Sequence, residues 1–190
     1  MGRHPILLRF SLRALLVMMT GLCIGVGLLI APAVRQKDAV AWVVNNGGSV
    51  VYDSPPKSHR YKWLSERIGR DYFDSVIGVT LVAKRITDVR PLSSLPHLRQ
   101  LNLSGNRIDD ISPLTGLVRI EKLNLDANRV KDITALAGME RLEVLLADSN
   151  FISDVTPLFT LSRLTEVSVR GNYVTSQELD RLRTTFPDCK

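Results

Sequence analysis

A repeat of 22 residues dominates the second half of this 190-residue chain. Four asparagines recur at that spacing, each in the same frame of apolar positions: Asn106, Asn128, Asn150 and Asn172. A fixed period of about 20 to 50 residues indicates a solenoid, because one coil cannot bury its apolar side alone and neighbouring coils must stack. The sequence therefore predicts stacked coils that share a continuous core.

The first parts of each predicted coil are a strand and a turn. The alternation in Leu101-Asn102-Leu103 is typical of a short strand whose two leucines face the core. The chain must then turn at Asn106, and an asparagine amide can both donate to and accept from the backbone groups that such a turn buries. We therefore expect the four asparagines to form a structural ladder that satisfies the turns of neighbouring coils.

The convex part of each coil is expected to be a short helical turn. A hydroxyl residue, Ser112, Thr134 or Thr156, is its predicted N-cap, and proline follows the first and last of these. A ladder of aspartates precedes it at the same period: Asp88, Asp110, Asp132 and Asp154. One carboxylate per coil does not supply the roughly six to eight oxygens of a Ca²⁺ site, so we interpret these residues as acceptors in turns.

The quoted motifs resemble the 22-residue leucine-rich repeats of the internalin type, over residues 76–185, as about five coils. The resemblance implies an α/β fold, a leucine-rich-repeat solenoid with short parallel strands on its concave side and short helical turns on its convex side. Residues 35–75 are similar to the N-terminal cap of short anchored bacterial proteins of this repeat type. In that region we expect a helix over 39–44, a strand over 49–52 and a short helix over 63–69.

The C-terminal end of the repeats carries its own predicted cap. Thr175 and Glu178 have the spacing of a capping box, and Leu179, Leu182 and Phe186 follow at helical spacing. We expect this helix to close the last coil and residues 186–190 to form a C-terminal tail.

The N-terminal region is dominated by residues 14–34, which contain no charged side chain. A helix of this length spans about 30 Å, the thickness of a bilayer core. Because Arg3, Arg9 and Arg13 precede it, we expect residues 1–13 to be a basic cytoplasmic tail, residues 14–34 a single transmembrane anchor, and the repeat domain extracytoplasmic. The alternative is a cleaved signal peptide that ends near Ala33 and a secreted repeat domain.

The net charge of +6 is concentrated near this leader. Residues 1–38 hold five of the 25 basic residues and one of the 19 acidic residues, so the remainder is only weakly basic. A basic leader is what membrane orientation requires, and we therefore predict no nucleic-acid partner.

The sequence offers no recognisable catalytic set. The three histidines, His4, His59 and His97, stand apart, and neither a nucleophile turn, a phosphate-binding loop nor a cluster with metal-ligand spacing is present in the sequence. We expect a non-enzymatic protein without cofactor or metal.

The outward positions of the predicted concave sheet are the candidate binding residues, because the core does not dictate their side chains. They are Gln100, Asn102, Lys122, Asn124, Asp126, Val144, Leu146, Asp148, Glu166 and Arg170. Val144 and Leu146 are apolar residues beside Lys122 and Arg170, a combination that indicates a contact patch.

These features predict a membrane-anchored module that binds a protein partner through its concave face. The alternative is a structural or assembly protein that forms a homo-oligomer through Gly21, Gly25 and Gly27 of the anchor, or through the edges of the coils.

Overall fold

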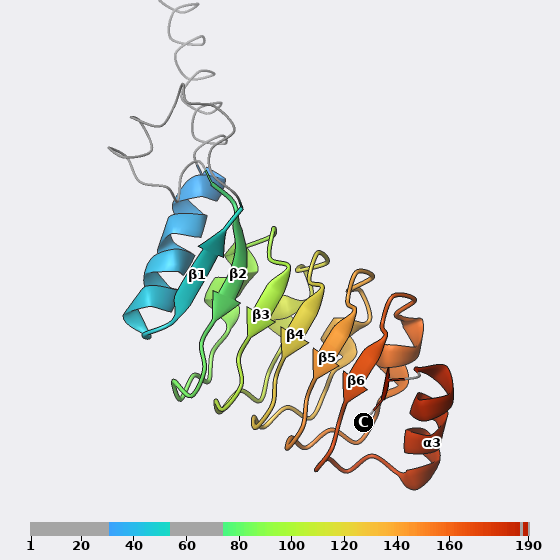
Figure 1. Cartoon of the computed structure of the whole chain (residues 1–190). Helices are drawn as coiled ribbons and strands as arrows, with labels where there is room; N and C mark the ends of the chain where they lie inside the picture. Colours follow the sequence, from blue (N-terminus) through green and yellow to red (C-terminus); the bar gives the residue numbers. More distant parts are fainter. Residues whose placement is uncertain (1–30, 54–73, 187, 190) are drawn as a thin grey trace, which may run out of the picture.

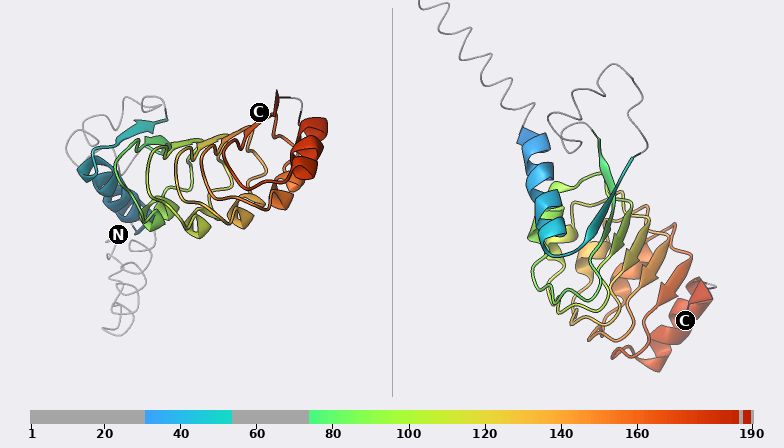
Figure 2. Two further views of the ribbon diagram at one scale, coloured as in Figure 1. Left: turned by 90° about the horizontal axis from the view of Figure 1, so that it is seen from below. Right: turned by 60° about the vertical axis from the view of Figure 1, so that its left-hand side comes forward.

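The structure is a computed structural model that describes residues 31–53, 74–186 and 188–189. Its framework is one seven-stranded sheet in which the strands follow their order in the sequence. Strand β1 pairs antiparallel to β2, and β2 to β7 pair in parallel. Figures 1 and 2 show that the sheet lines the inner side of an arc and that short helices lie on its outer side. The predicted leucine-rich-repeat solenoid, with its parallel strands, is confirmed.

The elements recur once per coil. Residues 31–45 are helical. The strands are β1 (Ser49–Tyr52), β2 (Val76–Thr80), β3 (Gln100–Asn102), β4 (Lys122–Asn124), β5 (Val144–Leu146), β6 (Glu166–Ser168) and β7 (Asp188–Cys189). The convex side carries the 3-10 helices η3 (Arg90–Ser94), η4 (Ser112–Leu114), η5 (Thr134–Leu136) and η6 (Thr156–Thr160), and α3 (Ser176–Thr185) follows the last coil.

The asparagine ladder joins each coil to the one before it. Asn128 Oδ1 accepts the backbone N–H of Ile108 at 3.1 Å, and its Nδ2 donates to the carbonyl oxygens of Leu103 and Leu125, both at 2.9 Å. The other ladder residues, Asn106, Asn150 and Asn172, make the equivalent bonds. The predicted ladder is therefore confirmed. It satisfies backbone groups that would otherwise be buried without partners.

The convex turns begin differently from the prediction. Ser112, Thr134 and Thr156 are the first residues of η4, η5 and η6, and no side chain caps these helices within the described part of the chain. Instead, the aspartate two residues earlier accepts their backbone N–H, each at 2.8 Å. The expected hydroxyl caps are wrong because an aspartate turn already accepts the first free N–H. The interpretation of the aspartate ladder as turn acceptors is confirmed.

The turn before each ladder position requires a left-handed backbone. Gly105 and Gly171 have φ values of 71° and 66°, and the equivalent Ala83, Ala127 and Ser149 have values of 55°, 52° and 56°. This conformation is strained for residues with a Cβ, so three of the five coils hold a side chain where glycine would be relaxed.

Cap elements cover both ends of the solenoid. At the first end, the helix over 31–45 buries Ala39, Val40 and Val43, and β1 extends the sheet. The strand predicted over 49–52 is confirmed, and the predicted helix over 39–44 lies within the observed helical residues. The short helix predicted over 63–69 lies outside the described residues.

At the other end, α3 begins with the predicted capping box of Thr175 and Glu178. Leu182 and Phe186 are buried, and Phe186 stacks on Phe159 of η6 with ring centroids 6.1 Å apart. The guanidinium of Arg181 lies 4.0 Å from the Phe159 ring centroid. The stretch expected to be a C-terminal tail differs from the prediction, because it contains this buried phenylalanine and strand β7. Phe186 packs against the last coil, and β7 pairs in parallel with β6.

The predicted membrane segment, residues 14–34, lies outside the described residues except for its last four positions. Among the residues that the structure describes, no helix is long and apolar enough to cross a membrane.

Candidate functional site

The concave face presents its outward side chains in three rows that cross the coils. Leu101, Leu123 and Leu145 alternate inward and are buried, which fixes the residues on either side of them as outward-facing. The strand register aligns Gln100, Lys122, Val144 and Glu166 in a first row, and Asn102, Asn124, Leu146 and Ser168 in a second. Asp126, Asp148 and Arg170 follow the strands as a third row. The structure thus brings all ten candidate residues to one face.

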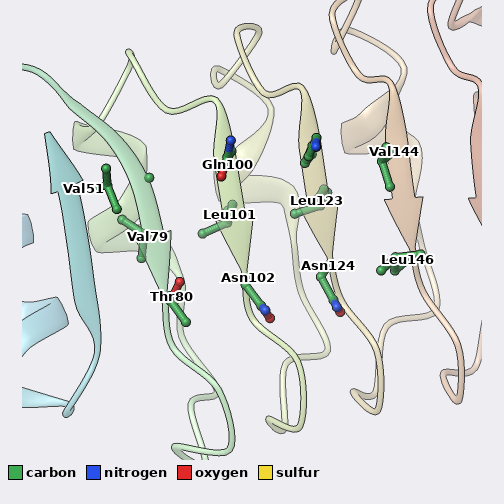
Figure 3. Close-up of a pocket in the computed structure, with 12 residues that line it drawn as sticks. Val51, Val79, Thr80, Gln100, Leu101, Asn102, Leu123, Asn124, Val144 and Leu146 are labelled. Atoms are coloured by element: carbon green, nitrogen blue, oxygen red, sulfur yellow. The ribbon is translucent and has the colours of Figure 1, made fainter. Parts of the chain in front are cut away.

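A shallow hollow of about 310 Å³ lies over the first two rows. Lys122 is the charged residue among its lining, and the amides of Gln100, Asn102 and Asn124 provide donors and acceptors. Val144 and Leu146 are half-buried apolar residues at one side of it. In Figure 3, the outward side chains that line the hollow come from neighbouring strands: Gln100, Asn102, Asn124, Val144 and Leu146. This surface combines apolar contact area with uncharged polar groups, as binding sites commonly do.

Val51 of β1 is a lining residue that sequence reasoning missed. Its side chain is 56 % exposed and lies over Gly78 of β2, where a glycine Cβ would stand 3.2 Å from the Val51 Cβ. The absence of a side chain at Gly78 therefore leaves room for Val51 on the concave face. Val51 faces Val144 and Leu146 across the hollow from its opposite side (Figure 3). The antiparallel pairing that places Val51 there gives no signal in the repeat pattern.

The carboxylates of the third row bind the backbone of the following coil. Asp126 Oδ1 accepts the Asp148 N–H at 2.8 Å. Asp148 Oδ1 in turn accepts the Arg170 N–H and the Ser168 hydroxyl, both at 2.7 Å. These two candidates therefore help to hold the concave edge together. Asn102 and Asn124 also accept backbone N–H groups, from Ser104 and Asp126. Within the described ranges, the exposed Lys122 side chain forms no hydrogen bond or ion pair, and Val144 and Leu146 present apolar surface to the hollow, so these three candidates are free to meet a ligand.

Hydrogen bonds and a neighbouring guanidinium lower the pKa values of three convex aspartates. The Arg90 guanidinium, which donates to Asp88 at 2.7 Å, holds the pKa of that carboxyl below its ordinary value. Hydrogen bonds from the Ser112 side chain and backbone lower the pKa of Asp110, and Thr156 lowers the pKa of Asp154 in the same way. The described residues contain no group of three or more histidine, cysteine, aspartate or glutamate side chains arranged to hold a metal ion.

This fold and its concave face define a leucine-rich-repeat protein. A family model described as leucine-rich repeats in two copies matches residues 80–116 and 96–138. A comparison with curated protein sequences gave no match.

Solved structures place internalins among its structural neighbours. Internalin C2 from Listeria monocytogenes is 38% identical with a TM-score of 0.52, and the alignment covers 58% of this chain and 48% of that one. A leucine-rich-repeat protein of Leptospira interrogans is similar in fold, with 24% identity and a TM-score of 0.50 over 56% of this chain and 28% of that one. This chain thus spans less than half the length of either structure.

Proposed function

We propose that this chain is a non-enzymatic binding module that recognises a protein partner through the concave face of its repeats. The observation that carries the proposal is the hollow where Val51, Val144 and Leu146 surround uncharged amides and Lys122. These three apolar side chains point outward and do not contribute to the core, because the inward leucines already fill it. Solenoids use their curved inner surfaces for extended contacts with partners.

The composition of the hollow favours a protein over a small charged ligand. Its two sides are apolar, uncharged amides and one cation lie between them, and the hollow is open along the sheet rather than enclosed. Such a surface fits a partner's apolar side chain with its backbone groups bonded to Asn102 and Gln100. Charged residues are depleted at the centre of protein interfaces, which matches this arrangement.

The membrane anchor over residues 14–34 and an extracytoplasmic position of the repeats belong to the same proposal. Their support is the uncharged apolar segment and the arginines that precede it. Secretion after cleavage near Ala33 is the alternative. Detection of residues 1–13 in the mature protein by mass spectrometry supports the anchor, and a mature N-terminus near residue 34 contradicts it.

Site-specific photo-crosslinking in the native cell tests concave recognition. The probe replaces Lys122, whose exposed side chain forms no hydrogen bond or ion pair with another described residue, and the control probe replaces Ala137 on the convex side. We expect a discrete adduct from position 122 that disappears when Leu146→Gln is added and persists when Val118→Gln is added. Val118 is a matched exposed apolar residue outside the hollow. Equal labelling from positions 122 and 137 contradicts the proposal.

The assembly alternative receives less support from the described coils. Ala39 and Val43 cover the apolar end of the first coil, and Leu182 and Phe186 cover that of the last, so stacking of coils end to end would bury little new apolar surface. The anchor glycines Gly21, Gly25 and Gly27 lie outside the described residues.

A further inference from the structure

A stripe of arginine and aromatic side chains runs along the sheet edge that follows the strands, the lower edge in Figure 1. Each residue of the stripe comes directly after a ladder asparagine: Arg107, Arg129, Phe151 and Tyr173. The backbone N–H of each donates to the coil before it, to Ile86, Ile108, Val130 and Ile152, at 2.8 to 2.9 Å. Because neighbouring parallel strands are about 4.8 Å apart, this register holds the four side chains in one rigid row.

The basic part of the stripe is free to meet a ligand. Arg107 and Arg129 are exposed, and neither guanidinium forms an ion pair with another described residue. An exposed guanidinium without a carboxylate partner can form two parallel hydrogen bonds to a carboxylate supplied by another molecule.

The aromatic part is exposed as well. Phe151 and Tyr173 have 41% and 68% of their surface exposed, and their rings stack on one another with centroids 6.0 Å apart. A partner that covers these two rings would remove their apolar surface from water. Tyrosine, phenylalanine and arginine are also residue types that are enriched in protein interfaces.

Beyond the aromatic pair the surface becomes basic again. Asn172 and Val174, on either side of Tyr173, line a hollow of about 320 Å³ between the last coil and α3. Arg170 and Arg183 also line this hollow. The surface therefore has the order cation, aromatic pair, cation along the axis of the solenoid.

We propose that this edge is a second interaction surface, distinct from the hollow over the first two rows of the concave face, and that it binds an extended protein segment whose central apolar residues are flanked by carboxylates. Charge complementarity selects an acidic partner, and the aromatic pair selects an apolar centre. A polyanion with a charge on every unit fits less well. The aromatic pair between the two basic parts of the stripe offers no cation to a continuous line of phosphates or sulfates. The two rings already stack on each other, so no base can enter between them.

The test uses the purified full chain and a fluorescein-labelled peptide in which three glutamates precede and three follow a Phe-Leu-Phe core. A second peptide, with glutamine in place of all six glutamates, measures how much the carboxylates contribute to binding. Fluorescence anisotropy measures the Kd. We expect the acidic peptide to bind, the glutamine peptide to bind at least about tenfold more weakly, and the double variant Arg107→Gln/Arg129→Gln to weaken the acidic peptide by about tenfold.

The matched control is Arg141→Gln/Arg163→Gln, which removes the same charge from the opposite edge, three residues before β5 and β6. We expect this control to change the Kd by less than about twofold and Phe151→Ala/Tyr173→Ala to weaken binding of both peptides. Far-UV circular dichroism verifies that each variant is folded.

Failure of the acidic peptide to bind, or equal weakening by the two arginine pairs, overturns the proposal. So does tighter binding of oligothymidylate or dextran sulfate, which assigns the stripe to a nucleic acid or a polysaccharide. We expect Leu146→Gln, in the concave hollow, to leave binding of the acidic peptide unchanged, so the proposals for the two surfaces are tested independently.

Discussion

Asp148 accepts the backbone N–H of Arg170 at 2.7 Å, one coil further along the solenoid. The same carboxylate oxygen accepts the Ser168 hydroxyl, so one side chain on the concave edge joins two groups of the next coil. We expect Asp148→Ala to lower the free energy of unfolding by about 2 kcal/mol, because two hydrogen bonds to its carboxyl group are lost. Asp148→Asn keeps an acceptor oxygen and should cost about half as much. Urea unfolding measures both, and Asp109→Ala at an exposed position is the control. A loss no greater than that of the control contradicts this role.

The ladder asparagines should differ in importance according to their burial. Asn128→Ala leaves the Ile108 N–H and two carbonyl oxygens without their partners in the interior, and we expect a loss of about 3 kcal/mol or more. Asn172→Ala makes the same change in the last coil, where the group is only partly buried and water can replace it, so the loss should be smaller. Urea unfolding of the two variants compares them. Equal losses would show that water already reaches the ladder throughout.

The left-handed turns provide a stabilising substitution. Ala127 has a φ of 52°, and we expect Ala127→Gly to raise the free energy of unfolding by about 1 kcal/mol by relieving this strain. The reverse change, Gly105→Ala, should lower it by about 1 kcal/mol, since the added Cβ would meet Ala83 atoms only at 3.5 Å and conformational strain alone decides the result. Thermal and urea unfolding of both variants give the comparison. Destabilisation by Ala127→Gly would mean that chain entropy outweighs the strain.

The convex aspartates should make the fold sensitive to acid. The pKa of Asp88 is lowered chiefly by the Arg90 side chain, and the pKa values of Asp110 and Asp154 are lowered by Ser112 and Thr156. A carboxyl whose pKa is lower in the folded state contributes stability above its unfolded value, near 3.9, and loses it as the pH falls through the folded value.

The free energy of unfolding should therefore fall as the pH drops below about 5 and through the lowered pKa values of these carboxyls. The triple variant Asp88→Asn/Asp110→Asn/Asp154→Asn should show a shallower fall in urea titrations at each pH. An unchanged slope in the triple variant would assign the acid sensitivity to other carboxyls.

The repeat period made most of the fold predictable from the sequence. The positions of Leu101, Leu123 and Leu145, and the amides that follow them, obey local rules of alternation and turn chemistry, and stacking then leaves little choice of topology. The ten candidate residues reached one face for the same reason, because a strand residue beside an inward leucine must point outward.

Three features were not predicted from the sequence, each for a different reason. The position of Val51 follows from antiparallel pairing of β1 with β2 and from the missing side chain of Gly78, neither of which belongs to the 22-residue pattern. In the convex turn, Asp110 rather than the Ser112 hydroxyl accepts the first free backbone N–H. Both residue types can accept such a bond, so the sequence alone does not decide between them. Phe151 and Tyr173 do stand at the repeat spacing, so following the residue after each asparagine would have found the aromatic pair.

The direction of the asparagine ladder has a consequence for synthesis. Asn106 bonds to Ile86 N–H and to the Leu81 carbonyl, which belong to the coil before its own. Each later asparagine likewise completes its predecessor. A ribosome makes the chain from the N-terminus, so every coil waits unfinished until about one more repeat has emerged from the exit tunnel. The solenoid should therefore assemble vectorially, with one immature coil always at its growing end and a finished surface behind it.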